Sequence, residues 1–168
     1  PAYWRDRTVL EVLYATGIRV SELIGLRITD LELDTRVCTV FGKGAKERMV
    51  PIGRPACLAL ERYLCEVRPS LDRGRGQGRV FLSHRGRPLP RTTVWTLVRS
   101  AALAAGIKAT VSPHTLRHTF ATHLLEGGAD LVAVQELLGH ADVTTTQIYT
   151  HVDRRYLRDV HQKYHPRS

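Results

Sequence analysis

The sequence is poor in cysteine, in acidic residues and in long apolar runs. Its three cysteines, Cys38, Cys57 and Cys65, are unevenly spaced and form no CxxC motif, which argues for reduced thiols and against a disulfide framework or a zinc ribbon. No apolar run approaches the roughly 18 residues that a membrane-spanning helix needs, and no signal-like start is present. We therefore expect a cytoplasmic globular protein that neither spans a membrane nor is visibly exported.

The shortage of acidic residues leaves the chain strongly basic. Lys and Arg number 25 against 16 Asp and Glu, which gives a formal net charge of +9 and a pI near 10. This excess favours a polyanionic partner, although a protein that is merely basic and soluble is an open alternative. The 168 residues, 43% of them apolar, are enough for one well-buried domain and short for two. Because the chain opens on Pro1 rather than Met, we expect it to be a fragment of a longer protein.

The apolar periodicity predicts a mainly α domain carrying a small antiparallel β-sheet of about three strands. Segments 36–41 and 47–52, joined by a glycine-rich turn, predict a β-hairpin with a basic tip, and 80–83 predicts a strand that could pair with it. Residues 72–78 predict a loop, with no second core to justify a domain boundary there. Helices are expected at 4–15, 20–26, 55–67, 92–105, 113–126, 130–138, 143–151 and 153–164.

The stretch SPHTLRH places three potential cations at the start of one helix. Ser112 suits the N-cap and Pro113 the first helical position, so His114, Arg117 and His118 share one face at i, i+3 and i+4. The first turn of a helix normally attracts Asp or Glu, so this pattern suggests an external anion. A solvated face is one alternative. A zinc site is another, but it lacks the Glu of HExxH, and an adjacent arginine would repel the ion.

Two further cationic features lie in the first third of the chain. Arg19 stands between a helix stop and the next helix, so its guanidinium can point into a cleft; the alternative is an ion pair with Glu22 at i+3. Lys43 and Lys46 flank Gly44 at the hairpin tip. A lysine there is usually solvated, but a glycine-flanked turn can also push an ammonium into a narrow groove.

Near the C-terminal end, the sequence LLGHADVTTTQIYTH contains a histidine and a tyrosine. His140 follows Gly139, where it could serve merely as a helix cap, and Tyr149 could equally be a core residue.

Together, the sequence offers two arginines, a lysine, two histidines and a tyrosine, with no acidic cluster for magnesium and no GxxxxGK[ST] motif. That combination describes phosphoryl transfer without a metal. Arginine forks neutralise the non-bridging oxygens, a tyrosine in a cationic neighbourhood attacks phosphorus, and a lysine protonates the departing alkoxide.

These motifs resemble the catalytic domain of the tyrosine site-specific recombinases, the phage integrase family, of the Xer type. The resemblance rests on LYATGIRVSELIGL, VFGKGAKERMVPIG, the stretch SPHTLRHTFATHLLEGGADLVAVQELLGHADVTTTQIYTHV and the end HQKYHPR. It covers almost the whole chain, is weakest between Arg68 and Arg91, and at the C-terminal end is closer to XerD than to XerC.

Matched residue by residue, the resemblance implies a role for each candidate. It makes Tyr149 the nucleophile that forms a 3′-phosphotyrosyl link, and Arg19 and Arg117 the ligands of the scissile phosphate. It makes Lys43 the general acid toward the 5′-oxygen, although Lys46 lies close by. His114 would assist proton transfer with Tyr149, and His140 would hydrogen-bond a phosphate oxygen. His118 has no counterpart role, and we expect it to support the site from behind.

The resemblance also implies the fold, the reaction and the partners. Residues 1–168 would form a single catalytic domain with the tyrosine recombinase fold, without the N-terminal domain that clamps the opposite side of the duplex. Strand exchange at a double-stranded recombination site would need no cofactor and no metal. Four protomers, paired with an XerC-like recombinase, would resolve chromosome dimers at cell division. The last helix would pack on a neighbouring protomer, and the FtsK translocase would act through the C-terminal end. A non-catalytic DNA-binding domain and a type IB topoisomerase-like relaxing enzyme are the alternatives.

Overall fold

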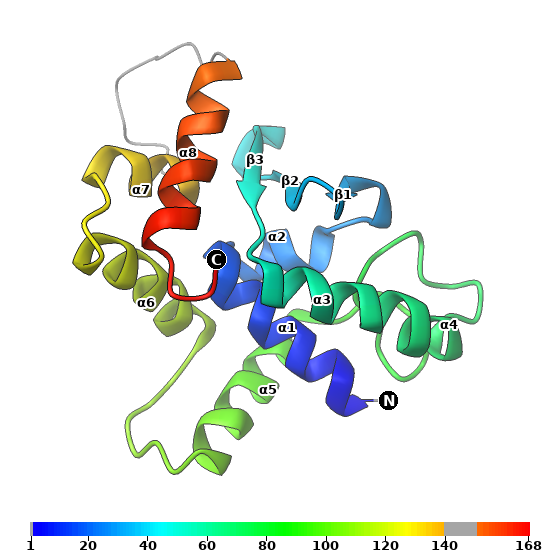
Figure 1. Ribbon diagram of the computed structural model, residues 1–168. Helices are drawn as coiled ribbons and strands as arrows, with labels where there is room; N and C mark the ends of the chain where they lie inside the picture. The colour runs from blue at the N-terminus through cyan, green and yellow to red at the C-terminus, as the bar shows by residue number, and fades with distance from the viewer. Residues whose placement is uncertain (1, 140–150) are drawn as a thin grey trace.

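The computed structural model describes residues 2–139 and 151–168, and there helices lie beside and below one small sheet at the edge of the molecule (Figure 1). This confirms the expected mainly α fold with a three-stranded antiparallel sheet. The helices are α1 (Ala2–Thr16), α2 (Val20–Gly25), α3 (Arg54–Arg62), α4 (Arg68–Leu71), α5 (Arg91–Ala104), α6 (Pro113–Glu126), α7 (Leu131–Leu138) and α8 (His151–Tyr164). The strands are β1 (Leu31–Glu32), β2 (Val37–Phe41) and β3 (Glu47–Pro51), and the short helical turns are η1 (Ile28–Asp30), η2 (Lys43–Ala45) and the π-helical η3 (Tyr63–Val67).

Local chemistry explains where the helices that frame the site begin and end. Helix α1 stops at Gly17, which has a φ of +65°, a backbone conformation that glycine adopts without strain. Helix α6 begins as predicted: the Ser112 side chain accepts a hydrogen bond from the Thr115 amide at 3.4 Å, and Pro113 takes the first helical position. Helix α7 ends at Gly139 with a φ of +69°. The chain therefore turns sharply just before His140.

The sheet has the order β1-β2-β3, with both pairings antiparallel. The predicted hairpin is confirmed, but the expected pairing of 80–83 with it is wrong, because β1 takes that place. Residue Val80 instead donates its amide to the Leu26 carbonyl at 2.9 Å, and the Arg79 side chain donates to the Gly25 carbonyl at 2.8 Å. The segment is thus bound to the end of α2.

The loop at 72–78 lies within one core. Val80, Phe81 and Leu82 beyond the loop belong to the same apolar cluster as Leu60 before it. The buried Arg68 side chain holds the two ends together, because its guanidinium donates to the Arg79 carbonyl at 2.8 and 3.0 Å. The residues before and after the predicted loop therefore pack into one apolar cluster.

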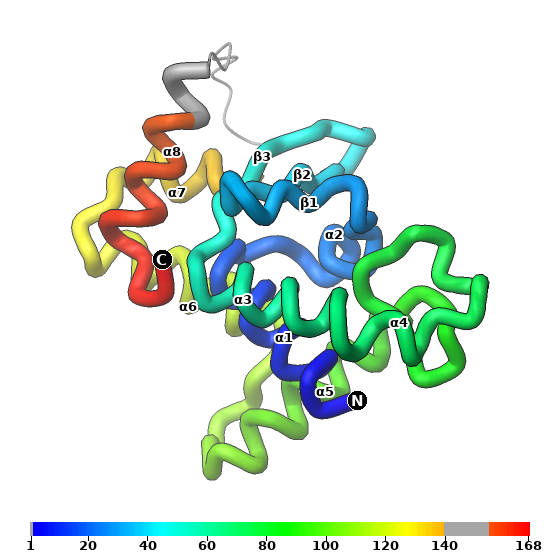
Figure 2. Tube along the Cα trace, turned by 45° about the vertical axis from the view of Figure 1, so that its right-hand side comes forward, coloured from blue at the N-terminus to red at the C-terminus, as the bar shows by residue number. Residues whose placement is uncertain are grey.

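Two apolar clusters meet at a seam. The larger one joins α1 to α5 with the sheet, and the smaller one joins α6, α7 and α8 through residues such as Phe120, Leu137 and Val160. Figures 1 and 2 both show α6, α7 and α8 gathered on one side of the molecule. At the seam the ring of Phe120 lies so close to Gly17 that any Cβ there would overlap it.

The C-terminal segment folds back onto α1. The Arg167 guanidinium donates to both carboxylate oxygens of Glu11, at 2.7 and 3.0 Å. The His161 ring donates to the Ala15 carbonyl at 2.6 Å, and the His165 ring to the Tyr14 carbonyl at 3.1 Å. In this chain, α8 and the segment after it therefore pack on their own domain.

Two of the three cysteines are inaccessible. Cys38 and Cys57 are buried and Cys65 is exposed. Burial raises the pKa of Cys38 to about 12 and that of Cys57 to about 11.

In the described part of the chain, no helix combines the length and apolarity that crossing a membrane would require.

Candidate active site

Arg117 lies at the seam between the two apolar clusters. Its Nη1 donates to the Gly17 carbonyl at 2.5 Å and its Nη2 to the Leu138 carbonyl at 2.8 Å. The side chain thus ties the end of α1 to the end of α7. Burial, followed by the positive charge of Arg19, lowers the pKa of Arg117 to about 10, so the group is still a cation at neutral pH.

Arg19 approaches the same place from the start of α2. Its backbone amide donates to Oε1 of Glu22 at 2.8 Å, while its Nη1 lies 3.9 Å from that oxygen. The Arg19 side chain is 40% exposed. The ion pair with Glu22 considered as an alternative therefore exists only as one long contact, and most of the guanidinium fork meets no other partner among residues 2–139 and 151–168.

The Glu22 carboxylate belongs mainly to Arg48 on β3. Both terminal nitrogens of Arg48 bond it: Nη1 pairs with Oε2, and Nη2 lies 3.0 Å from Oε1. Burial alone would raise the pKa of the Glu22 carboxyl, but the hydrogen bonds from Arg48 and from the Arg19 backbone lower it overall. The buried Glu22 carboxylate thus lies between Arg48 and Arg19, and its charge also acts on Arg117.

The hairpin tip lies beside this cluster. A Cβ placed on Gly42 would be 3.5 Å from Oε2 of Glu22 and 3.7 Å from Nη1 of Arg48. Lys43 follows at once in the short turn η2, where Gly44 has a φ of +74°, and Lys43 and Lys46 are both exposed. The backbone of the tip therefore lies close to the Glu22–Arg48 pair at Gly42, and Lys43 is the next residue.

The histidines of α6 are distributed differently. His114 is exposed, and its ring packs edge-on against Trp95 of α5 with centroids 5.5 Å apart. His118, expected behind the site, is also exposed. His123 bonds the Tyr14 hydroxyl through Nδ1 at 2.5 Å and so ties α6 to α1.

Two predicted catalytic residues, His140 and Tyr149, lie outside the described residues, as does most of the helix expected at 143–151. The description reaches Gly139, the residue immediately before His140. Of the six candidates, Arg117 bonds the carbonyl of Gly17, two residues before Arg19, and His114 lies one helical turn before Arg117. Lys43 follows Gly42, whose backbone lies close to the Glu22–Arg48 pair.

Sequence reasoning missed the pairing of Glu22 with Arg48, although a signal was present. In the sheet, Arg48 pairs directly with the buried Val40. Val50, two residues further along the strand, is also buried, and residues two apart in a strand share a face. A charged residue on the core-facing side of a strand needs a buried partner, and that requirement points to an acidic side chain such as Glu22.

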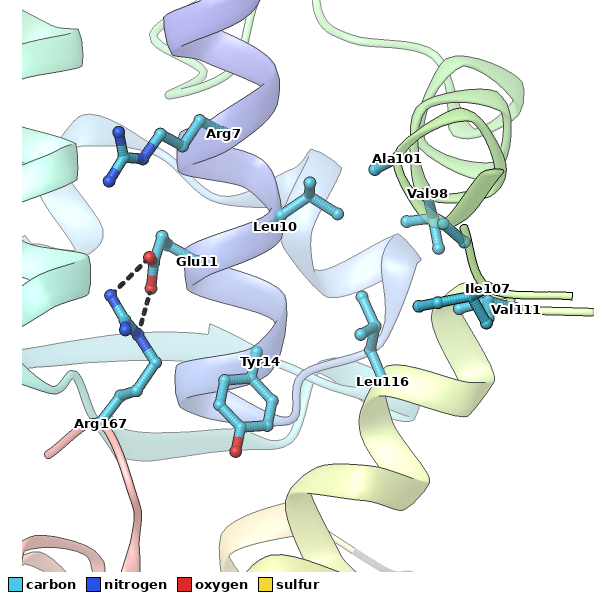
Figure 3. Close-up of a pocket in the computed structure, with 11 residues that line it drawn as sticks. Arg7, Leu10, Glu11, Tyr14, Val98, Ala101, Ile107, Val111, Leu116 and Arg167 are labelled. Carbon is cyan, nitrogen blue, oxygen red and sulfur yellow. Dashed lines mark hydrogen bonds and ion pairs between the residues drawn. The ribbon is translucent and has the colours of Figure 1, made fainter. Parts of the chain in front are cut away.

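Other potential sites are less well equipped. Among residues 2–139 and 151–168, no group of three or more His, Cys, Asp or Glu side chains could hold a metal ion. A separate pocket of about 420 Å³ lies between α1, α5 and α6 (Figure 3). Its walls are formed by apolar side chains such as Leu10, Val98 and Leu116, and the ion pair of Glu11 with Arg167 lies at one side. The arginine cluster is therefore the stronger candidate for phosphate chemistry.

The comparison with known families is decisive. Residues 1–155 match the phage integrase family. The chain belongs to the phage integrase family. Within this family it is 53% identical over 164 residues to the tyrosine recombinase XerD of Chlorobaculum tepidum and 55% identical over 169 residues to XerD of Mycobacterium tuberculosis. The alignments cover 98% and 100% of this chain but 54% of each relative. The chain thus spans about half the length of the curated relatives it matches.

Solved integrase-family structures agree with the fold. The XerA recombinase superposes with a TM-score of 0.76 at 38% identity, over 98% of this chain and 60% of the other. The XerH site-specific recombinase bound to its difH substrate, in a pre-cleavage complex, superposes with a TM-score of 0.74 at 31% identity, over 93% and 45%. The expected resemblance to Xer-type tyrosine recombinases is confirmed, and so is the fold class.

Proposed function

We propose that this integrase-family chain is the catalytic domain of a Xer-type recombinase that cuts and rejoins DNA through a covalent link to Tyr149. The observation that carries the proposal is that Arg19 and Arg117, 98 positions apart, approach one region of the fold, where Arg117 bonds the carbonyls of Gly17 and Leu138. Arg19 stands two residues after Gly17 and faces Glu22, whose partner Arg48 bonds the neighbouring Leu137 carbonyl. One guanidinium is anchored and the other is largely open. Such a pair suits two non-bridging oxygens of one phosphodiester.

In the proposed reaction, Arg19 and Arg117 hold the scissile phosphate and stabilise the charge that develops on it. The Tyr149 oxygen bonds to phosphorus, and the bond from phosphorus to the 5′-oxygen breaks. Lys43 gives its proton to that departing oxygen. His114 assists proton transfer with Tyr149, and His140 hydrogen-bonds a phosphate oxygen. Attack by the 5′-hydroxyl of a partner strand reverses these steps and returns the tyrosine, so the reaction conserves the bond energy without a cofactor.

The proposed substrate is a double-stranded recombination site. The net charge of +9 supports a polyanionic partner. The related XerH was captured on its difH site. The proposed role is chromosome dimer resolution in the cytoplasm, which fits the similarity to tyrosine recombinases named XerD. There the chain would act as the catalytic domain of a longer recombinase, with a helical domain clamping the opposite side of the duplex. Pairing with an XerC-like recombinase in a tetramer and control by FtsK through the C-terminal end belong to the same proposal.

Trapping the covalent intermediate tests the function. The full-length protein is incubated with its partner recombinase and a duplex nicked next to the cleavage site, with a chelator present. Cleavage releases the short strand between the nick and the cleavage site, and this strand diffuses away with the 5′-hydroxyl that religation needs. Wild-type protein is therefore expected to accumulate a covalent protein–DNA adduct. Tyr149→Phe should form none, while Tyr156→Phe, which changes an exposed tyrosine of α8, should react like wild type.

Adducts that form equally well with Tyr149→Phe would contradict the assignment of the nucleophile. Binding of the duplex without any adduct would instead favour a non-catalytic DNA-binding domain. Relaxation of supercoiled DNA without sequence preference would favour a topoisomerase.

A further inference from the structure

Arg48 uses every part of its guanidinium inside the protein. Its Nη1 and Nη2 bond the two oxygens of Glu22, and its Nε donates to the Leu137 carbonyl at 3.1 Å. The side chain is 15% exposed. It therefore has little left to offer a phosphate, although it belongs to the same cluster as Arg19 and Arg117.

The ion pair of Arg48 with Glu22 determines whether the Arg19 guanidinium is available to a phosphate. The Glu22 side chain is 2% exposed, and its nearest cations are Arg48, fully engaged, and Arg19, at 3.9 Å. A buried carboxylate without a partner is strongly unfavourable. If Arg48 were absent, Glu22 would draw the Arg19 guanidinium into a direct ion pair. The open fork that the phosphate needs would then be occupied.

The hydrogen bond from Arg48 to the Leu137 carbonyl fixes the C-terminal end of α7. The last carbonyls of a helix have no partners within it. Here Arg48 donates a hydrogen bond to the Leu137 carbonyl, and Arg117 donates one to the Leu138 carbonyl. Arg48 also fills the space beside Gly139, where a Cβ would lie 2.8 Å from its Nη1. The end of α7 is thus held by two arginines, Arg48 from β3 and Arg117 from α6.

We propose that Arg48 is a positioning residue of the recombinase site, which keeps Glu22 away from Arg19 and fixes the end of α7 without itself binding the phosphate. The inference rests on the proposed function. It differs from a purely structural role in one respect: removing the charge of Glu22 should compensate for the loss of Arg48.

The test uses the full-length protein and the nicked duplex described above. Cleavage rate at saturating protein and DNA affinity are measured separately for wild type, Arg48→Gln, Glu22→Gln and the double variant. Since small misplacements in a site cost about 100-fold in rate, Arg48→Gln should cleave about 100-fold more slowly. Its DNA affinity should stay within about threefold, because many phosphate contacts share the binding energy. The double variant should recover about tenfold in rate, because Arg19 is released while the α7 contact is still lost.

Two further variants guard against misfolding. Arg48→Lys keeps a cation beside Glu22 but loses the fork, so it should fold and cleave about tenfold more slowly than wild type. Arg62→Gln is the matched control, because Arg62 also pairs with a glutamate, Glu66 at 3.0 Å, but on the exposed surface of α3 and η3. It should cleave like wild type. Thermal unfolding of each variant shows that the assays are made on folded protein.

The outcomes separate the two proposals. Wild-type cleavage together with an equally fast Arg48→Gln or Arg48→Lys overturns the role of Arg48 alone. A double variant no faster than a folded Arg48→Gln also overturns it, because the loss would then be structural. Wild-type protein that forms no adduct at all overturns the proposed function and, with it, the inference.

Discussion

Arg117 and Arg48 donate hydrogen bonds to backbone carbonyls. For Arg117, these bonds fix the side chain before DNA binds. Arg117 is held by the carbonyls of Gly17 and Leu138, so its direction is set before a phosphate arrives. Such preorganisation lowers the cost of binding the transition state. Burial disfavours its charge, so an incoming anion relieves a cost already present in the free protein.

The role of Lys43 can be separated from that of Lys46 at the same tip. If Lys43 protonates the departing 5′-oxygen, Lys43→Ala should slow cleavage by about 10² to 10⁴-fold. A duplex with sulfur in place of that oxygen should restore the rate, because a thiolate departs without a proton. Lys46→Ala, which removes a neighbouring exposed lysine, should cleave both duplexes like wild type. Trapped adducts are counted over time; an equal deficit of Lys43→Ala on both duplexes would exclude the general acid.

At the scale of elements, the C-terminal segment is held by a pair of neutral histidines. The His161 and His165 rings are stacked with centroids 4.6 Å apart. In His165, Nε2 donates to the Tyr14 carbonyl while Nδ1 accepts from the Arg167 amide. Both nitrogens are therefore engaged in the neutral form, and a second proton would meet an N–H donor. Burial, followed by the electrostatic effect of the neighbouring His161 ring, lowers the pKa of His165 to about 4.

This arrangement predicts a pH dependence of stability. The pKa of His165 is lower in the folded chain, about 4, than the ordinary value of 6.5. Between these values the unfolded chain binds a proton that the folded chain does not, so the free energy of unfolding falls as the pH falls from 6.5 toward 4. We expect His165 to account for about 1–2 kcal/mol of the loss between pH 6.5 and pH 5, and none above pH 7.

Urea unfolding at several pH values measures this loss. His165→Asn, whose amide can still donate to the Tyr14 carbonyl, should be less stable at pH 7.5 but should lose less stability on acidification. His161, His123, Arg167 and Tyr14 all face His165 and are unchanged in both proteins. Identical slopes for the two proteins would contradict the prediction.

Local patterns predicted most elements, and long-range contacts explain the exceptions. The cap at Ser112 and the stop at Gly17 can be read within a few residues: α6 has both predicted ends, and α1 ends at Thr16, immediately before Gly17, although it begins two residues earlier than predicted. The partner of 80–83 could not be read in this way, because hydrogen bonds from Arg79 and Val80 to the end of α2, 54 positions away, determine it. Strand β1 has two residues, too few to show an alternation.

The same division holds for the candidate site. Arg19 and Arg117 could be identified because each stands in a short motif at a helix start. The pairing of Glu22 with Arg48 spans 26 positions. Glu22 lies in one motif and Arg48 in another, so neither motif alone reveals the pair. The hairpin pattern predicts that Arg48 faces inward, but only the packed structure shows which carboxylate it meets.

At the scale of the whole molecule, the seam between the two apolar clusters passes through Gly17. Its φ of +65° disfavours any side chain, and a Cβ would overlap the Phe120 ring. Strain of this kind costs about 1–3 kcal/mol, and overpacking costs a similar amount. Gly17→Ala should therefore lower the free energy of unfolding by at least about 2 kcal/mol, and it should slow cleavage because Arg117 is anchored on the Gly17 carbonyl.

Gly25→Ala is the matched control for this substitution. It lies at the end of α2, where a Cβ would meet no atom within 4 Å and φ is not positive, so its stability should stay within about 0.5 kcal/mol of wild type. Both variants are compared by chemical denaturation and by adduct formation. Equal stability of Gly17→Ala and Gly25→Ala would show that the seam tolerates a side chain.

The unequal burial of the three cysteines offers a practical advantage. The thiols of Cys38 and Cys57 are enclosed and resist ionisation, and a maleimide reacts with an accessible thiolate. Cys65 alone of the three is accessible, so this domain carries one natural attachment point for a fluorophore. A dye there would report on synapsis of DNA-bound recombinases by energy transfer, without any cysteine having to be added or removed from the domain.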